Sequence, residues 1–187
     1  MRRVLTLAAL LAAPVPALAH TGADHLHGFA AGFLHPVGGL DHVLAMVAVG
    51  LWAGLLGGRA IWALPAGFLG AMAVGFGVAT TGLGLPMVEA GILASVIVLA
   101  ALVASSARLS LAVAVPLVAL FGLLHGHAHG TELAGHGAVG YAAGFLAASA
   151  ALHGLGMLAA WQVTNRLVLR VAGGAIAALM LVVAGLG

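Results

Sequence analysis

The sequence predicts an all-α polytopic membrane protein with about six transmembrane helices that follow a cleavable signal peptide. Of the 187 residues, 64% are hydrophobic and only 5% are charged, whereas a soluble domain carries roughly 25% charged residues. Apolar runs close to the ~20 residues that a membrane-spanning helix needs recur along the chain. The arginines beyond the N-terminal region all fall in alternate links between these runs, as the positive-inside rule requires.

The N-terminal segment 1–19 has the pattern of a secretory signal peptide. Two arginines precede the short apolar stretch Val4–Ala13, and the small residues Ala17 and Ala19 occupy the positions that signal peptidase recognises. Because this stretch is too short to span a core ~30 Å thick, we expect cleavage that leaves His20 as the first residue. An uncleaved first helix is the alternative.

Residues 20–187 are expected to form a single six-helix transmembrane domain. The expected spans are 36–57, 61–80, 86–104, 109–126, 138–160 and 167–186. Many of the 29 glycines lie inside these runs. Small residues let helices approach closely in lipid, so we expect a tightly packed bundle.

The charged residues predict the orientation. With an exported N-terminus, the cytoplasmic links hold every arginine outside the signal peptide, namely Arg59, Arg108, Arg166 and Arg170. The acidic residues fall in the outer half, namely Asp24, Asp41, Glu89 and Glu132. We therefore expect an inner-membrane protein whose mature N-terminus faces outward. Because the arginines are scattered singly, a nucleic-acid partner is excluded, whereas a homo-oligomer stays open.

The chain contains ten histidines, as many as its Asp, Glu, Lys and Arg residues combined. Most of the histidines lie on the predicted outer side. These are His20, His25, His27 and His35 in or at the end of an exported segment 20–35, His42 in the first span, and His125, His127, His129 and His136 in a His-rich loop 125–137. His153 lies well inside a helix, as a deeper candidate. A single histidine in a bundle is usually a hydrogen-bonded packing residue, but this group beside Glu89 and the other carboxylates predicts metal binding.

The types of candidate ligand limit which metal ions the protein is expected to bind. The chain has no cysteine, which excludes thiolate metal sites and disulfide scaffolds. Imidazole and carboxylate ligands without thiolate favour Ni²⁺, Co²⁺, Zn²⁺ or Cu²⁺, with iron as a further candidate. We expect no permanent cofactor, so that the ion is cargo.

The first candidate site is the segment 35–42. His35 and His42 are seven residues apart, which on a straight helix places them ~10 Å apart along the axis. This separation is too large for one ion. Either Pro36 and the following glycines break the helix, or the two histidines serve successive positions. Asp41 could bind metal directly or orient an imidazole from behind.

The second candidate site is the segment 121–132. If it is helical, His125 and His129 lie one turn apart and can bind one metal ion. If it is extended, His125, His127 and His129 share one face. Glu132 follows three residues after His129 and completes either arrangement.

These residues resemble the HupE/UreJ family of small bacterial membrane proteins, which are regarded as nickel or cobalt permeases. The resemblance rests on the motifs His-Pro-x-x-Gly-x-Asp-His at 35–42 and Phe-x-x-x-His-Gly-x-Ala-His-Gly-x-Glu at 121–132. It implies uptake of Ni²⁺ or Co²⁺ across the bacterial inner membrane, with a hydrogenase or urease maturation system downstream. It assigns metal handling to His35, Asp41, His42, His125, His129 and Glu132, whereas His127 occupies a variable position.

Three alternatives to a permease remain at this point. The first is an intramembrane zinc hydrolase, although the chain contains no His-Glu-x-x-His motif. The second is a haem-binding membrane protein with two axial histidines. The third is a metal-binding protein of the membrane that carries out no transport.

Overall fold

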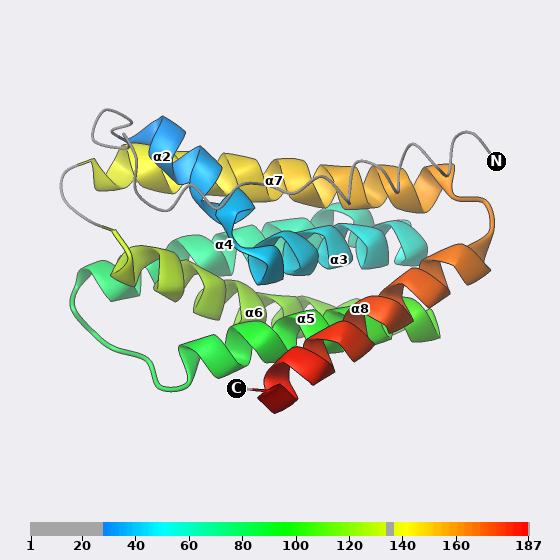
Figure 1. Ribbon diagram of the computed structural model, residues 1–187. Coiled ribbons are helices and arrows are strands. Elements are labelled where there is room, and N and C mark those ends of the chain that lie inside the picture. Colours follow the sequence, from blue (N-terminus) through cyan, green and yellow to red (C-terminus); the bar gives the residue numbers. More distant parts are fainter. Residues whose placement is uncertain (1–27, 134–136, 187) are drawn as a thin grey trace.

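The computed structural model of the protein describes residues 28–133 and 137–186, which form a bundle of helices (Figure 1). The predicted signal peptide lies outside the described residues. The same holds for Asp24 and for four of the candidate histidines, His20, His25, His27 and His136.

All the secondary-structure elements of the described residues are helical. The elements are α2 (Phe29–Leu34), a 3-10 turn (His35–Gly38), α3 (Leu40–Leu56), α4 (Ala60–Thr80), α5 (Val88–Ser105), α6 (Leu111–Thr131), α7 (Ala138–Gln162) and α8 (Arg166–Leu186). Helices α4 to α8 are each long and apolar enough to cross a membrane, and the bent pair of α2 with α3 brings the number of candidate spans to six when it is counted as one span. The described residues contain no strand. An all-α multi-pass membrane protein with about six spans is therefore confirmed.

The first span differs from the prediction at its start. The chain bends by 90° between Phe29–Gly38 and Leu40–Leu56, so the helix begins at Leu40 and not at residue 36. Pro36 lies in the 3-10 turn, and Gly39 adopts an extended conformation with φ −106° and ψ 118°. Of the two alternatives for segment 35–42, the structure shows the broken helix.

The prediction of a His-rich loop over 125–137 is wrong for its first half. Helix α6 continues through His125, His127 and His129 and ends at Thr131. Glycine weakens an isolated helix, but here it lets α6 approach α4. A Cβ atom on Gly126 would overlap the backbone of Met72, and one on Gly122 would overlap that of Phe68. Close packing between the two helices thus offsets the poor helix propensity of glycine.

The other helices pair in the same way. Helix α3 packs on α7, α5 packs on α8, and the short α2 lies over the first turns of α7 (Figure 1). Gly50 on α3 contacts the backbone of His153 on α7, where a side chain would not fit. The tightly packed bundle predicted from the glycines is observed.

The polar side chains divide between the two ends of the bundle. One end carries the 3-10 turn, the start of α3 and the end of α6, where His35 pairs with Glu132. The opposite end carries the arginines, and there Arg170 donates a hydrogen bond from Nε to the carbonyl oxygen of Ala104 at 2.9 Å. The fold therefore gathers the two candidate motifs at the end away from the arginines.

Candidate metal centre

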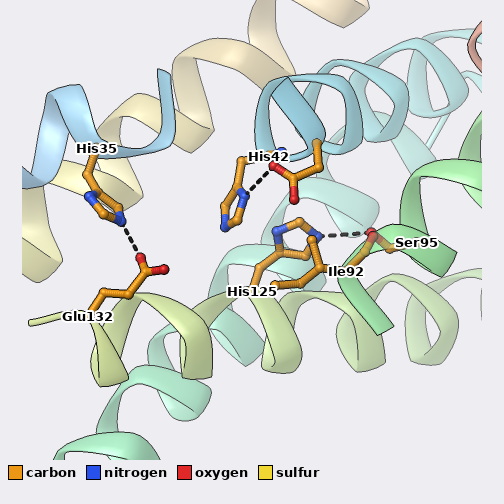
Figure 2. Close-up of polar contacts among 7 residues, drawn as sticks. His35, His42, Ile92, Ser95, His125 and Glu132 are labelled. Carbon is orange, nitrogen blue, oxygen red and sulfur yellow. Dashed lines mark hydrogen bonds and ion pairs between the residues drawn. The ribbon is translucent and has the colours of Figure 1, made fainter. Parts of the chain in front are cut away.

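Three elements contribute the candidate ligands. The 3-10 turn supplies His35, the first turn of α3 supplies Asp41 and His42, and α6 supplies His125 and His129, one turn apart on one face. Figure 2 shows His42 between the His35–Glu132 pair and the pair formed by His125 and Ser95. Residues almost 100 positions apart in the chain thus form one cluster.

The outermost group consists of His35, His129 and Glu132. Nε2 of His35 lies 2.5 Å from Oε2 of Glu132. Each of the three residues offers one ligand atom, and these atoms all lie within 4.8 Å of one another. His129 is buried, whereas the Glu132 side chain is half exposed. Two imidazoles and a carboxylate at this spacing can bind a divalent ion that arrives from solvent.

The carboxylate of this group is held in its ionised form. The hydrogen bond from His35 lowers the pKa of Glu132 below its ordinary value, against the opposing effect of burial. A negatively charged oxygen is therefore present in the outermost group over the whole physiological range of pH.

The second group is the Asp41–His42 pair. Oδ1 of Asp41 lies 3.0 Å from Nδ1 of His42 and 2.8 Å from the His42 backbone nitrogen. Because an ionised carboxylate only accepts hydrogen bonds, Nδ1 carries the proton and Nε2 keeps its lone pair. Asp41 thus orients the imidazole as the outer-shell carboxylates of metal-bound histidines do.

Gly39 leaves room for this pair. A Cβ atom at Gly39 would lie 2.9 Å from Oδ1 of Asp41 and 3.2 Å from Nδ1 of His42. The lack of a side chain at Gly39 therefore leaves the space in which the Asp41–His42 hydrogen bond forms.

The imidazoles form a continuous row from the 3-10 turn into the bundle. The ring centroids of His35 and His129 are 5.0 Å apart, those of His129 and His42 are 4.8 Å apart, and those of His42 and His125 are 4.7 Å apart. Aromatic rings border the row, since Phe145 stacks on His129 at 4.8 Å and Phe68 lies 5.5 Å from His125. We call these four histidines the imidazole row.

Several nitrogens of the imidazole row are buried without a hydrogen-bond partner among the described residues. They are Nε2 of His42, Nδ1 of His125 and both ring nitrogens of His129. An unsatisfied buried polar group costs about 1–3 kcal/mol, so such groups are rare in folded proteins. In a neutral imidazole one ring nitrogen carries a lone pair, and a bound cation would satisfy that lone pair in each of the three rings.

His153 lies deeper in the bundle and contacts Phe68, as His125 does. Its ring centroid is 5.3 Å from that of Phe68. Nδ1 of His153 donates a hydrogen bond to the carbonyl oxygen of Met46 at 2.7 Å. The other ring nitrogen is buried without a partner in the described part of the chain. His153 is therefore oriented in the same way as His42, with one ring nitrogen held by an acceptor.

Two candidates lie apart from the imidazole row. His127 faces the link between α4 and α5, where Nε2 donates to the carbonyl oxygen of Leu83 at 2.8 Å. Glu89 is exposed in the first turn of α5 and, with Asp41 and apolar side chains, lines an open cleft of about 490 Å³. The structure therefore brings neither residue into the imidazole row.

Sequence reasoning missed the aromatic border of the row. Phe68 on α4 occurs in neither motif. Phe145 on α7 belongs, with Tyr141 and His153, to a weaker third part of the family resemblance, which assigned no role to it. The sequence signals Ser95 only as a polar residue in the apolar run 86–104.

Comparison with known proteins adds two findings. The family described as HupE / UreJ protein matches residues 7–183 of the chain. The chain is also 47% identical over 179 residues to Protein HupE of Rhizobium leguminosarum bv. viciae, covering 94% of this chain and 93% of that protein. No solved structure matches the chain significantly.

Proposed function

Because the chain belongs to the HupE/UreJ family, we propose that it is a membrane permease that carries divalent transition-metal ions, with Ni²⁺ or Co²⁺ as the cargo. The observation that carries the proposal is the imidazole row, which leads from the end of the bundle into its core with adjacent rings no more than 5.0 Å apart. We propose no enzymatic activity and no resident cofactor.

The spacing of the row supports transfer by ligand exchange. A divalent ion lies ~2.0–2.1 Å from an imidazole nitrogen, so two ligand nitrogens about 4 Å apart can share one ion. The ion binds first at His35, His129 and Glu132, passes to Nε2 of His42 and then reaches Nδ1 of His125. Each ligand releases the ion as the next ligand binds it. Conduction requires such weak binding at several successive sites.

The driving force follows from the proposed orientation. The histidine end faces outward and the arginine end faces the cytoplasm, in agreement with the positive-inside rule. A divalent cation that moves inward then gains ~4.6 kcal/mol per 100 mV of membrane potential, twice the value for one elementary charge. The sequence contains no nucleotide-binding motif that would couple transport to ATP.

A zinc hydrolase is the second candidate, because two histidines and a glutamate are also the ligands of a common class of catalytic zinc sites. The observation that favours it is the group of His35, His129 and Glu132. A hydrolase has no use for His42 and His125 beyond that group, and for this reason we place it second.

The uptake of radioactive nickel by cells tests the permease. The variants are His42→Gln, which removes a ring nitrogen of the row, and the matched control His127→Gln, whose amide can still donate to Leu83. We expect His42→Gln to lose most of the uptake and His127→Gln to retain it at equal protein levels. Equal uptake by His42→Gln and the unmodified protein would overturn the relay.

Vesicles that contain the purified protein separate the two candidates. A metal-sensitive dye inside the vesicles reports entry of Ni²⁺ when an inside-negative potential is applied. The permease predicts entry that requires the protein, whereas a hydrolase predicts binding of metal at the surface without entry.

A further inference from the structure

Ser95 lies behind the innermost imidazole of the row. It is fully buried on α5, and its hydroxyl has two partners. Oγ lies 2.6 Å from the carbonyl oxygen of Ile92 and 2.9 Å from Nε2 of His125 (Figure 2). The contact joins α5 to α6 across 30 positions of the chain.

The direction of both hydrogen bonds follows from counting protons. A carbonyl oxygen only accepts, so the single hydroxyl proton of Ser95 is donated to Ile92. The hydroxyl oxygen must then accept from His125, which requires a proton on Nε2 of the imidazole. In the neutral ring, Nδ1 is therefore the nitrogen that keeps a lone pair.

The free nitrogen lies on the side of the metal path. Nδ1 of His125 is buried and has no hydrogen-bond partner in the described residues. Figure 2 shows this nitrogen on the side of the ring that faces His42, and the two ring centroids are 4.7 Å apart. The other tautomer would present an N–H group to the ion and could not bind it.

We propose that Ser95 is a positioning residue for metal transfer, which holds His125 in the tautomer whose Nδ1 receives the ion from His42. The inference rests on the proposed permease function and deepens it. Ser95 itself does not touch the ion. It acts as Asp41 does for His42, through a hydrogen bond to the ring nitrogen that points away from the path.

The two orienting groups differ in charge, and the difference favours release of the ion from the inner ligand. A carboxylate that accepts a hydrogen bond from one ring nitrogen raises the basicity of the other, ligating nitrogen. A neutral hydroxyl that accepts the same hydrogen bond raises this basicity less. His42 is then the stronger ligand and His125 the weaker one. A weak inner ligand releases the ion further into the bundle and does not trap it.

The variants that test Ser95 separate its hydroxyl from its volume. Ser95→Ala removes the hydroxyl. Ser95→Thr and Ser95→Val form a matched pair of nearly equal shape, of which only threonine can donate to the helix backbone and accept from His125. Ser105→Ala is the control on the same helix, because the Ser105 hydroxyl bonds to the Ala101 carbonyl oxygen at 2.8 Å and has no hydrogen bond to a histidine of the described residues.

Two measurements are made on the full-length protein. Nitrogen-15 NMR of histidine-labelled protein reports the tautomer of His125, whose signals are identified by their loss in His125→Gln. Nickel uptake by vesicles gives the maximal rate and the half-saturating concentration separately. The tautomer is read without transport, so a failure of the permease proposal, in which the unmodified protein shows no uptake, is distinguishable from a failure of this one.

We expect Ser95→Ala and Ser95→Val to lose the fixed Nε2–H tautomer of His125. Their maximal uptake should fall by about 10–100-fold, as for other outer-shell partners of metal ligands. The half-saturating concentration should change little, because the outer group is intact. Ser95→Thr and Ser105→Ala should keep the tautomer and most of the rate. An unchanged tautomer in Ser95→Ala, or equal behaviour of the threonine and valine variants, would overturn the proposal.

Discussion

Each oriented imidazole on the proposed metal path has one nitrogen fixed by a hydrogen-bond acceptor, and its other nitrogen has no partner in the described residues. Asp41 fixes His42, and Ser95 fixes His125. Deeper in the bundle, the Met46 carbonyl fixes His153. The acceptor changes from a charged carboxylate to neutral groups along the path. The chemistry of single residues therefore sets where an ion can bind and how tightly.

The residue scale also predicts how uptake depends on pH. A histidine binds metal only when its ring is neutral. The hydrogen bond from His35 lowers the pKa of Glu132 below its ordinary value, so that this carboxylate is ionised throughout the range from pH 5 to pH 8. Uptake should therefore fall when acid protonates ligand imidazoles, with no separate loss from Glu132 in that range.

The measurement is the initial rate of nickel uptake by vesicles between pH 5 and 8 at a fixed membrane potential. Glu132→Gln serves as the comparison, since it removes a ligand oxygen and should lower the rate across the whole range of pH. A rate that stays constant or rises as the pH decreases would contradict neutral histidines as ligands.

Single residues were predicted with uneven success. The motifs identified the four histidines of the row, because their spacing and the nearby carboxylates are visible in the sequence. The direction in which each ring points was not visible. His127 lies between two residues of the row in the sequence but bonds to Leu83 on another side of α6, since successive positions of a helix point about 100° apart.

At the scale of elements, the break before α3 is what makes the site compact. On a straight helix His35 and His42 would be ~10 Å apart along the axis, whereas the 90° bend lets both rings contact His129. The helical continuation of α6 is equally important, because it places His125 and His129 on one face.

Gly39 provides a test of this element. Alanine fits its backbone conformation, which is extended and not left-handed, so that only the steric effect of the added Cβ matters. Gly39→Ala should displace the Asp41 carboxylate from His42 and lower maximal nickel uptake by about tenfold. Gly38→Ala is the matched neighbour, because nothing lies within 4 Å of an added Cβ there.

Both glycine variants should be recovered from the membrane in similar amounts and with similar melting temperatures in detergent. Uptake rates that are the same for the two variants would mean that the close fit of Gly39 to the Asp41–His42 pair has no role in transport.

On the scale of the whole molecule, the bundle separates two kinds of polar residue. The imidazole row and the carboxylates Asp41, Glu89 and Glu132 occupy one end, and the four described arginines occupy the other. The proposed orientation places the negative end outside, where it attracts cations. It places the positive end where the positive-inside rule expects it.

The absence of cysteine in the natural chain makes the orientation simple to test. Gly84→Cys introduces a thiol in the exposed link between α4 and α5, and Ser110→Cys introduces one in the link before α6. A maleimide that does not cross the inner membrane should label Gly84→Cys in intact cells and Ser110→Cys only after permeabilisation. The opposite labelling would reverse the proposed direction of the path.

The sequence by itself determined the membrane class, the approximate number of spans, and the segments that carry the candidate ligands. These properties depend on local composition, since a run of apolar residues must be helical in lipid and ionisable residues in such a run are costly unless they are paired or functional. The His-x-x-x-His spacing of the second motif was visible in the sequence, but its secondary structure was not. The glycines within the motif weaken helices in water, so the sequence did not decide between a helix and an extended segment.

Only the tertiary structure decided which of these residues meet. The bend at Gly39, the close contact of Gly126 with Met72, the pairing of His35 with Glu132 and the hydrogen bond from His125 to Ser95 all join distant parts of the chain or depend on such contacts. Such contacts are set by how helices pack, and packing depends on the shapes of both partners. No local pattern contains that information, so the segments that carry ligands could be predicted from the sequence, whereas the row that they form could not.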